Sequence, residues 1–173
     1  MNTRTLVLLS LFVGIGAVLH TVIPGFFFGM KPDMMLTMMF LGIMLFPNKT
    51  AVSLLAIATG IISGVTTSFP GGFIPNIVDK VVTAAIFFGL FTLLKAKATP
   101  IKAALLTAVG MFISGATFLA VALIIVGLPG GATFGGLFIA VVIPTAFVNT
   151  IAMIVIYPIV QSLMRRTYTV PQQ

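Results

Sequence analysis

The sequence has no cysteine, no tryptophan and no glutamate, and it has few charged residues of any kind. Charged residues make up 6% of the 173 residues, whereas a soluble domain carries about a quarter. So few charges cannot cover a surface that faces water. A soluble enzyme, a nucleic-acid-binding protein and a disordered chain are therefore excluded, and the lack of cysteine excludes disulfides and thiol chemistry.

Most of the side chains are apolar. Hydrophobic residues make up 60% of the chain, with ten methionines and sixteen phenylalanines, and the mean hydropathy is +1.27. The net charge of +7 comes from basic residues scattered along the chain, whereas nucleic-acid binding needs them clustered on one face. The composition predicts an integral membrane protein.

Proline, glycine and charged residues divide the chain into six apolar stretches. A bilayer core of ~30 Å needs about 20 apolar residues per helix. The second stretch is the shortest, and at 1.5 Å per residue it makes only ~20 Å of helix. The predicted spans are residues 5–23, 34–46, 51–68, 76–94, 102–126 and 136–163. The sequence thus predicts an all-α membrane protein with one six-helix transmembrane domain.

Basic residues are distributed unevenly between the two sides of these six spans. The side with both termini collects Arg4, Lys49, Lys95, Lys97, Lys102, Arg165 and Arg166. The other side has only Lys31 and Lys80, each close to an aspartate. Because cytoplasmic loops are enriched in Lys and Arg, both termini are predicted to be cytoplasmic. The outward connections are longer and rich in Gly, Pro and Phe, and we expect the binding residues there.

Both acidic residues lie on this outward side. Asp79 and Lys80 share a helical face with Asn76, and Asp33 is placed to cap the helix that follows it. Ionisable groups at membrane depth are costly and typically mark a ligand path or a proton relay. An amino-acid ligand suits this set, because its ammonium needs a carboxylate and its carboxylate needs a lysine or free backbone N–H groups.

Each of these residues also has a simpler interpretation. The aspartates and lysines could neutralise one another within the local pairs Asp79–Lys80 and Lys31–Asp33. His20, near the outward end of the first span, could be an ordinary interfacial residue. Buried amides often bridge helices, and threonines near helix ends often bond to their own backbone. Asn149 in the last span and Thr67 after the third span could act in these ways.

Methionines at a spacing of four residues in the second predicted span suggest a metal ion as an alternative ligand. Met34 and Met38 share one helical face, as do Met35 and Met39. Thioethers can bind Cu(I), although filling the space between helices is the commoner role of methionine. A Cu(I) carrier therefore stays as a minor alternative.

Enzymatic motifs are missing from the sequence. Without glutamate there is no HExxH motif, and neither a G-x-S-x-G elbow nor a G-x-x-x-x-G-K-[ST] phosphate loop occurs. We expect neither catalysis nor a cofactor. If the chain transports a solute uphill, the energy has to come from a partner subunit or from an ion gradient.

Seven short segments, in order along the whole chain, resemble one known family. These are GAVLH at 16–20, GMKPD at 29–33, TGIIS at 59–63, FPGG at 69–72, IPN at 74–76 with Asp79-Lys80, GLPGG at 127–131 and NTI at 149–151. Together they are similar to the tryptophan transporter family of Gram-positive bacteria, the tryptophan-specific S-components of energy-coupling factor (ECF) transporters. The resemblance implies a six-helix subunit that captures L-tryptophan outside the cell. It also implies a transmembrane coupling protein and two cytoplasmic ATPase subunits as partners.

With L-tryptophan as the ligand, we expect the following roles for the candidate residues. Asp79 or Asp33 takes the ammonium, Lys31 or Lys80 the carboxylate, and Asn149 or His20 the indole N–H. Methionine and phenylalanine side chains of the second and fourth helices pack against the indole. The substrate-binding residues expected on this basis are His20, Lys31, Asp33, Met34, Met38, Thr67, Asn76, Asp79, Lys80 and Asn149.

The resemblance also implies a docking site for the coupling protein. Many S-components carry Ala-x-x-x-Ala on the first helix, and here Ser10-x-x-x-Gly14 stands in its place. Small residues at this spacing allow helices to approach closely, either in docking or in ordinary packing within the bundle.

Two other functional classes stay open beside this one. The chain could be a structural subunit without a small ligand, or a carrier for another aromatic compound, a vitamin or Cu(I). A binding subunit requires the outward polar residues to converge on one cavity, and a structural subunit does not.

Overall fold

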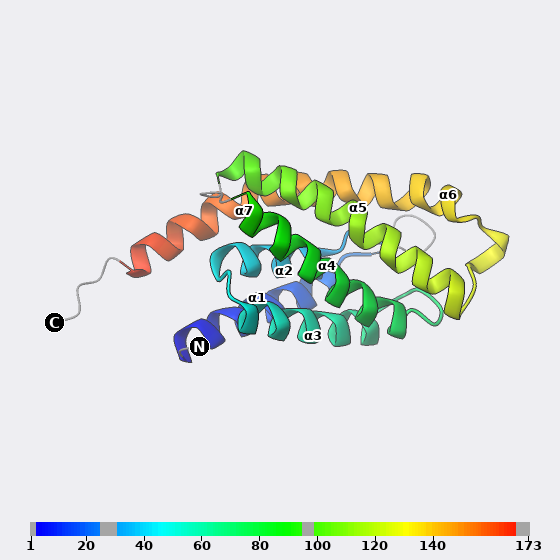
Figure 1. The fold of residues 1–173 in the computed structure, drawn as a ribbon, viewed down its shortest axis with the longest axis horizontal. Coiled ribbons are helices and arrows are strands. Elements are labelled where there is room, and N and C mark those ends of the chain that lie inside the picture. Colours follow the sequence, from blue (N-terminus) through cyan, green and yellow to red (C-terminus); the bar gives the residue numbers. More distant parts are fainter. Residues whose placement is uncertain (1–2, 25–30, 95–98, 169–173) are drawn as a thin grey trace.

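The computed structural model describes residues 3–24, 31–94 and 99–168, with only the backbone for residues 165–168. Within these ranges every regular element is a helix, as predicted. The elements are α1 (Thr3–Val22), α2 (Met34–Leu45), α3 (Lys49–Val65), α4 (Phe73–Leu93), α5 (Pro100–Ile125), the 3-10 turn η1 (Pro129–Gly131), α6 (Phe134–Leu137), the π-helical turn η2 (Phe138–Val142) and α7 (Ile143–Tyr168). The long helices run back and forth along one axis, and the start of α1 and the end of α7 lie toward the same end (Figure 1).

Polar side chains fix where several helices begin. The side-chain oxygens of Asp33, Asn48 and Thr99 each accept a hydrogen bond from the backbone N–H three residues later. They thereby satisfy one of the free N–H groups at the starts of α2, α3 and α5. The capping role predicted for Asp33 is confirmed.

Most predicted boundaries differ from the structure by one to five residues, and two of the helix starts show why. Helix α4 begins at Phe73 and not at residue 76, because Pro75 lies in the first turn, where its missing N–H breaks no helical hydrogen bond. The last helical stretch begins at Phe134 and contains the π-helical turn η2 near its start. Such turns often occur at functional sites.

Four helical segments within the described residues are long and apolar enough to cross a membrane. They are Thr3–Val22, Phe73–Leu93, Pro100–Ile125 and Phe134–Met164. The apolar helices α2 and α3 are shorter, with 12 and 17 residues. The structure therefore agrees with a membrane protein of several helices, and the six-span count stays a prediction.

Helix α2 occupies the centre of the bundle. It packs against α1, α3, α4, α5 and α7, and all of its residues except Leu45 are buried. A helix that is apolar on every face is one enclosed on every side, which explains the uniform sequence of this stretch. The stacked rings of Phe40 and Phe87, with centroids 4.0 Å apart, join α2 to α4.

Glycine allows α3 and α4 to approach closely. A Cβ on Gly64 would lie 2.9 Å from the carbonyl oxygen of Phe73. A Cβ on Gly60 would lie 3.1 Å from the Cα of Ile77. These contacts set the position of the first turns of α4, which carry the charged residues of the candidate site.

Substituting alanine for Gly64 should therefore destabilise the protein, because α4 would have to move away from α3. Overpacking of this kind typically costs about 1–3 kcal/mol. Gly89 is the matched control, since a Cβ there would meet no atom within 4 Å. We expect Gly64→Ala to lower the midpoint of thermal unfolding in detergent and Gly89→Ala to leave it unchanged or raised. Equal midpoints for the two variants would contradict the close contact.

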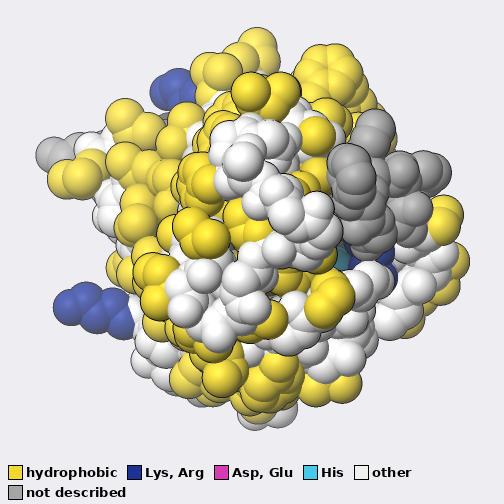
Figure 2. Space-filling model, turned by 90° about the vertical axis from the view of Figure 1, so that its right-hand side faces the viewer, with side chains coloured by type: hydrophobic (Ala, Val, Ile, Leu, Met, Phe, Trp, Pro, Cys, Tyr) yellow, Lys and Arg dark blue, Asp and Glu magenta, His cyan; other side chains and the backbone are white. Residues whose placement is uncertain are grey.

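The surface agrees with a membrane environment. Large apolar side chains are exposed on the helices, including Val22 at 73% and Ile124 at 82% of their full area. Arg4, Lys49 and Lys102 lie near the helix starts at the end of the bundle where α1 begins. Figure 2 views the opposite end, where apolar side chains dominate and few charged ones are visible. The other basic residues predicted for the cytoplasmic side are not placed by the structure. Lys95 and Lys97 lie outside the described residues, and only the backbone is described for Arg165 and Arg166.

Candidate functional site

A cavity lies toward the end of the bundle where α1 ends and where α2 and α4 begin. It brings together most of the polar residues that the sequence singles out. These are His20, Lys31, Asp33, Thr67, Asn76, Asp79, Lys80 and Asn149. The residues come from segments far apart in the chain and meet around one space, which is the arrangement that a binding subunit requires.

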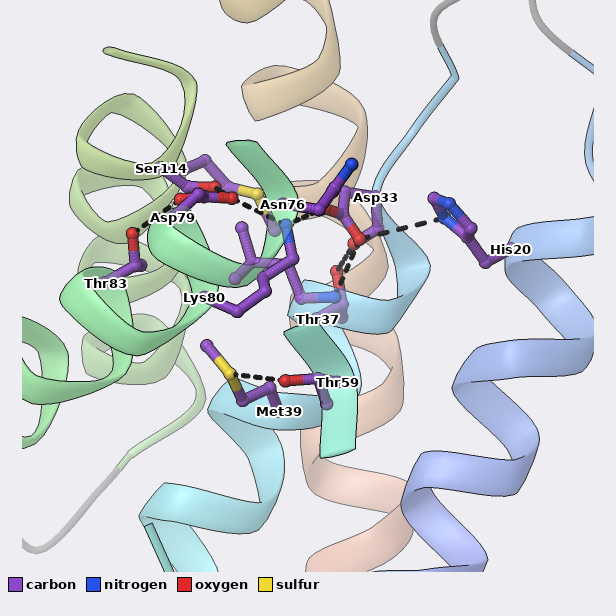
Figure 3. A network of polar contacts seen from close by, with 12 residues as sticks. His20, Asp33, Thr37, Met39, Thr59, Asn76, Asp79, Lys80, Thr83 and Ser114 are labelled. Carbon is purple, nitrogen blue, oxygen red and sulfur yellow. Dashed lines mark hydrogen bonds and ion pairs between the residues drawn. The ribbon is translucent and has the colours of Figure 1, made fainter. Parts of the chain in front are cut away.

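Lys80 is the centre of the charged part of the cavity. Its Nζ donates a hydrogen bond to Asp33 Oδ2 at 2.6 Å and to Asp79 Oδ2 at 2.7 Å (Figure 3). The Lys80 side chain is only 2% exposed. The local pair Asp79–Lys80 is thus present, whereas Asp33 pairs with Lys80 and not with its near neighbour Lys31.

The carboxylates of Asp33 and Asp79 differ in their hydrogen-bond partners and in their exposure. Besides Lys80, the Asp79 carboxylate accepts hydrogen bonds from Thr83 Oγ1 at 2.9 Å and from Ser114 Oγ at 2.8 Å, and its side chain is 1% exposed. The Asp33 side chain is 23% exposed and also accepts the backbone N–H that it caps. Asp33 is therefore the carboxylate more accessible to a ligand.

Two further basic side chains line the cavity, and one of them, His20, lies close to Asp33. The Nδ1 atom of His20 is 3.8 Å from Asp33 Oδ1, and His20 is buried. Lys31 is partly buried and lines the cavity, and among the described residues it forms no ion pair. Lys31 thus presents a positive charge that is not engaged by the described part of the protein.

Asn149 connects the charged part of the cavity to an apolar part. Its Nδ2 donates to the backbone carbonyl of Asp33 and lies near Met111 Sδ, both at 3.2 Å. Beyond it the walls are Met111, Phe118 and Val142, among other apolar residues. Phe118 makes an edge-to-face contact with Phe69, with ring centroids 5.2 Å apart. This wall presents sulfur and aromatic surface suited to a flat apolar ring.

The remaining predicted residues are placed differently. Met34 and Met38 are buried but are not among the residues that line the cavity. Met38 faces α1, because a Cβ added at Gly16 of α1 would lie only 3.2 Å from the Cβ of Met38. Met39 accepts a hydrogen bond from Thr59 through its sulfur. Met38 and Met39 thus pack between helices, and the residue of α2 that lines the cavity is Leu36.

Several residues of the cavity were missed at the sequence level. They are Leu36, Ser68, Phe69, Met111, Ser114, Gly115, Phe118, Val141, Val142 and Thr145. Serine and apolar residues are common inside membrane helices, so most of them carry no distinctive signal. Thr83, which supports Asp79, follows it by four residues, and this helical spacing is a signal that could have been used.

Ser10 and Gly14 lie on an outer face of α1. Both are exposed, and a Cβ on Gly14 would meet no atom within 4 Å. Of the two roles that the sequence left open for them, packing within the bundle is therefore not the one seen.

Comparison with known proteins identifies the family to which this chain belongs. The family model described as tryptophan transporter TrpP matches residues 2–165. The chain belongs to the tryptophan transporter family. It is 56% identical over 167 residues to a protein of Bacillus subtilis described as a probable tryptophan transport protein, with 96% of each chain covered. A protein of Clostridium acetobutylicum with the same description is 42% identical, over 95% of this chain and 96% of its own length.

A third tryptophan transport relative, from Clostridium perfringens, is 38% identical over 95% of both chains. No solved structure matches the chain. Membership of the tryptophan transporter family supports tryptophan as the substrate and a location in the membrane. It also suggests that the chain is not an enzyme.

Proposed function

We propose that this chain is the substrate-binding S-component of an ECF importer that takes up L-tryptophan across the bacterial cell membrane. The observation that carries the proposal is the convergence of buried charges of both signs and an apolar wall on one cavity. An amino acid with a large side chain needs these three features together. The tryptophan transport relatives support the choice of substrate.

The ammonium of the substrate binds at Asp33 in this proposal. The cluster holds two carboxylates, the partly buried Asp33 and the buried Asp79, and one buried ammonium, Lys80. With all three ionised, one negative charge is not balanced, and an unbalanced buried charge is costly. A ligand ammonium removes that cost, and Asp33 offers the more exposed carboxylate. Asp79 then acts indirectly, by holding Lys80 in position.

The carboxylate of the substrate binds at Lys31. Lys80 is already engaged by two carboxylates at 2.6 and 2.7 Å, so an anionic ligand group gains little there. Lys31 lines the same cavity as Asp33 and has no ion-pair partner among the described residues. The two charges of a zwitterionic amino acid thus meet opposite charges two residues apart in the chain.

The indole ring lies in the apolar part of the cavity. Met111 and Phe118 from α5, together with Val141 and Val142 from the π-helical turn, form its wall. Burying apolar area contributes about 25 cal/mol per Å², which favours a large ring over a small side chain at this wall.

The remaining parts of the proposal concern orientation and partners. The cavity lies at the end of the bundle away from Arg4, Lys49 and Lys102, so the positive-inside rule puts it outside and both termini in the cytoplasm. The exposed small residues Ser10 and Gly14 on α1 allow a helix of the coupling protein to dock closely. Two ATPase subunits supply the ATP hydrolysis for which this sequence carries no motif.

Reconstitution in liposomes tests the importer role. We expect the chain alone to bind L-tryptophan but not to accumulate it in the vesicles. Adding the coupling protein and the ATPase subunits should make accumulation dependent on ATP, and omitting ATP from these vesicles is the matched control. Accumulation by the chain alone, driven by a proton or sodium gradient, would show a secondary transporter instead.

A further inference from the structure

Two buried polar atoms of cavity-lining residues have no hydrogen-bond partner among the described residues. They are Oδ1 of Asn149 and Nδ1 of His20. Asn149 is fully buried, with an exposed fraction of 0%. A buried acceptor without a partner is unfavourable, and a ligand that brings a matching donor removes the penalty.

The contacts of Asn149 determine which end of its amide is free. The Nδ2 atom lies 3.2 Å from the backbone carbonyl oxygen of Asp33 and 3.2 Å from Met111 Sδ. Both partners can only accept hydrogen bonds. If the amide were turned over, its oxygen would face two acceptors, so the orientation with Oδ1 free is the one that these neighbours require.

The position of Asn149 suits a donor on an aromatic ring. Asp33 belongs to the charged part of the cavity, and Met111 belongs to the apolar wall. Asn149 contacts both through Nδ2. Because Oδ1 belongs to the same amide group, the free acceptor is held close to the boundary between the site proposed for the amino-acid head group and the site proposed for the ring. His20, in contrast, lies 3.8 Å from the Asp33 carboxylate, on the head-group side.

We infer that Asn149 Oδ1 accepts a hydrogen bond from the ring N–H of the substrate and makes the site select indoles over rings of the same shape without a donor. This inference rests on the proposed function and deepens it. Shape alone discriminates weakly between isosteric rings, whereas a buried acceptor left without a partner penalises the ring that lacks the donor. Asn149 is thus a specificity-determining residue, and His20 is not the ring acceptor.

The test compares L-tryptophan with its benzothienyl analogue, in which sulfur replaces the ring N–H. The non-fluorescent analogue competes with bound L-tryptophan, whose emission is measured on purified full-length protein. We expect the wild-type protein to bind L-tryptophan at least about tenfold more tightly. In Asn149→Leu the ratio of the two affinities should fall to near one, mainly through loss of L-tryptophan affinity. In the control variant His20→Leu the ratio should be retained.

The ratio in the wild-type protein needs no variant to fold, so it tests the inference even if Asn149→Leu is unstable. Equal affinity of the wild-type protein for both ligands would overturn the inference while the tryptophan-binding function stands. An unchanged ratio in Asn149→Leu, or a ratio lost in His20→Leu, would also overturn it. Failure of folded wild-type protein to bind either ligand would instead remove the proposed function.

Discussion

Replacing Lys80 with methionine is expected to lower the free energy of unfolding by about 3–5 kcal/mol, the usual cost of removing one partner of a buried ion pair. The substitution keeps an apolar stem of similar length but removes the ammonium between Asp33 and Asp79. The two carboxylates would then share a buried space with no cation between them. The loss of stability should therefore exceed the one expected for Gly64→Ala.

Thermal unfolding in detergent measures this effect, with two variants as controls. Lys102→Met removes an exposed lysine and should leave the midpoint nearly unchanged. Adding Asp79→Asn to Lys80→Met removes one of the two opposed carboxylates and should restore part of the lost stability. A Lys80→Met protein as stable as Lys102→Met would show that the ion-pair cluster does not hold the helices together.

The second large effect is expected on binding. Asp33→Asn should weaken L-tryptophan binding by at least about tenfold, because a hydrogen bond to a charged group typically contributes about 1.5–3 kcal/mol. Asparagine is as good a helix N-cap as aspartate, so the start of α2 should persist and the loss should report on the charge. The measurement is a titration of purified variant and wild-type protein with L-tryptophan.

A ligand without the ammonium provides the control for Asp33→Asn. Indole-3-propionate keeps the ring and the carboxylate but lacks the ammonium, so it should bind the wild-type protein more weakly than L-tryptophan does. Asp33→Asn should leave the affinity for indole-3-propionate nearly unchanged or raise it. The preference for L-tryptophan over indole-3-propionate should therefore fall in Asp33→Asn. If the preference is unchanged in a folded variant, Asp33 does not bind the ammonium and Asp79 becomes the candidate.

The sequence predicts the helices of this protein better than it predicts their contacts. Caps and breakers act over three or four residues, so the start of α2 after Asp33 can be located from the sequence. The predicted start of α4 is too late because Pro75 resembles a breaker, although the first turn of a helix tolerates proline. The faces of α2 cannot be distinguished, because a helix enclosed on all sides has no polar stripe.

The polar residues of the site can be chosen from the sequence, but their pairing cannot. Lys80 and Asp33 are 47 positions apart, and only the packing of α4 against α2 brings them together. From the sequence, Asp33 could be paired only with its neighbour Lys31, because nothing in it shows a more distant partner. Ser114 was missed for the same reason, since its contact with Asp79 depends on the position of α5.

The central claim is that the folded chain binds L-tryptophan in an apolar pocket, and ligand fluorescence tests it most directly. The protein has no tryptophan and only two tyrosines, so indole emission from the purified protein comes from bound ligand. We expect blue-shifted emission that stays with the protein through a desalting column, or appears on titration, and saturates near one equivalent. A folded protein that shows no such emission at any concentration of L-tryptophan would contradict the account.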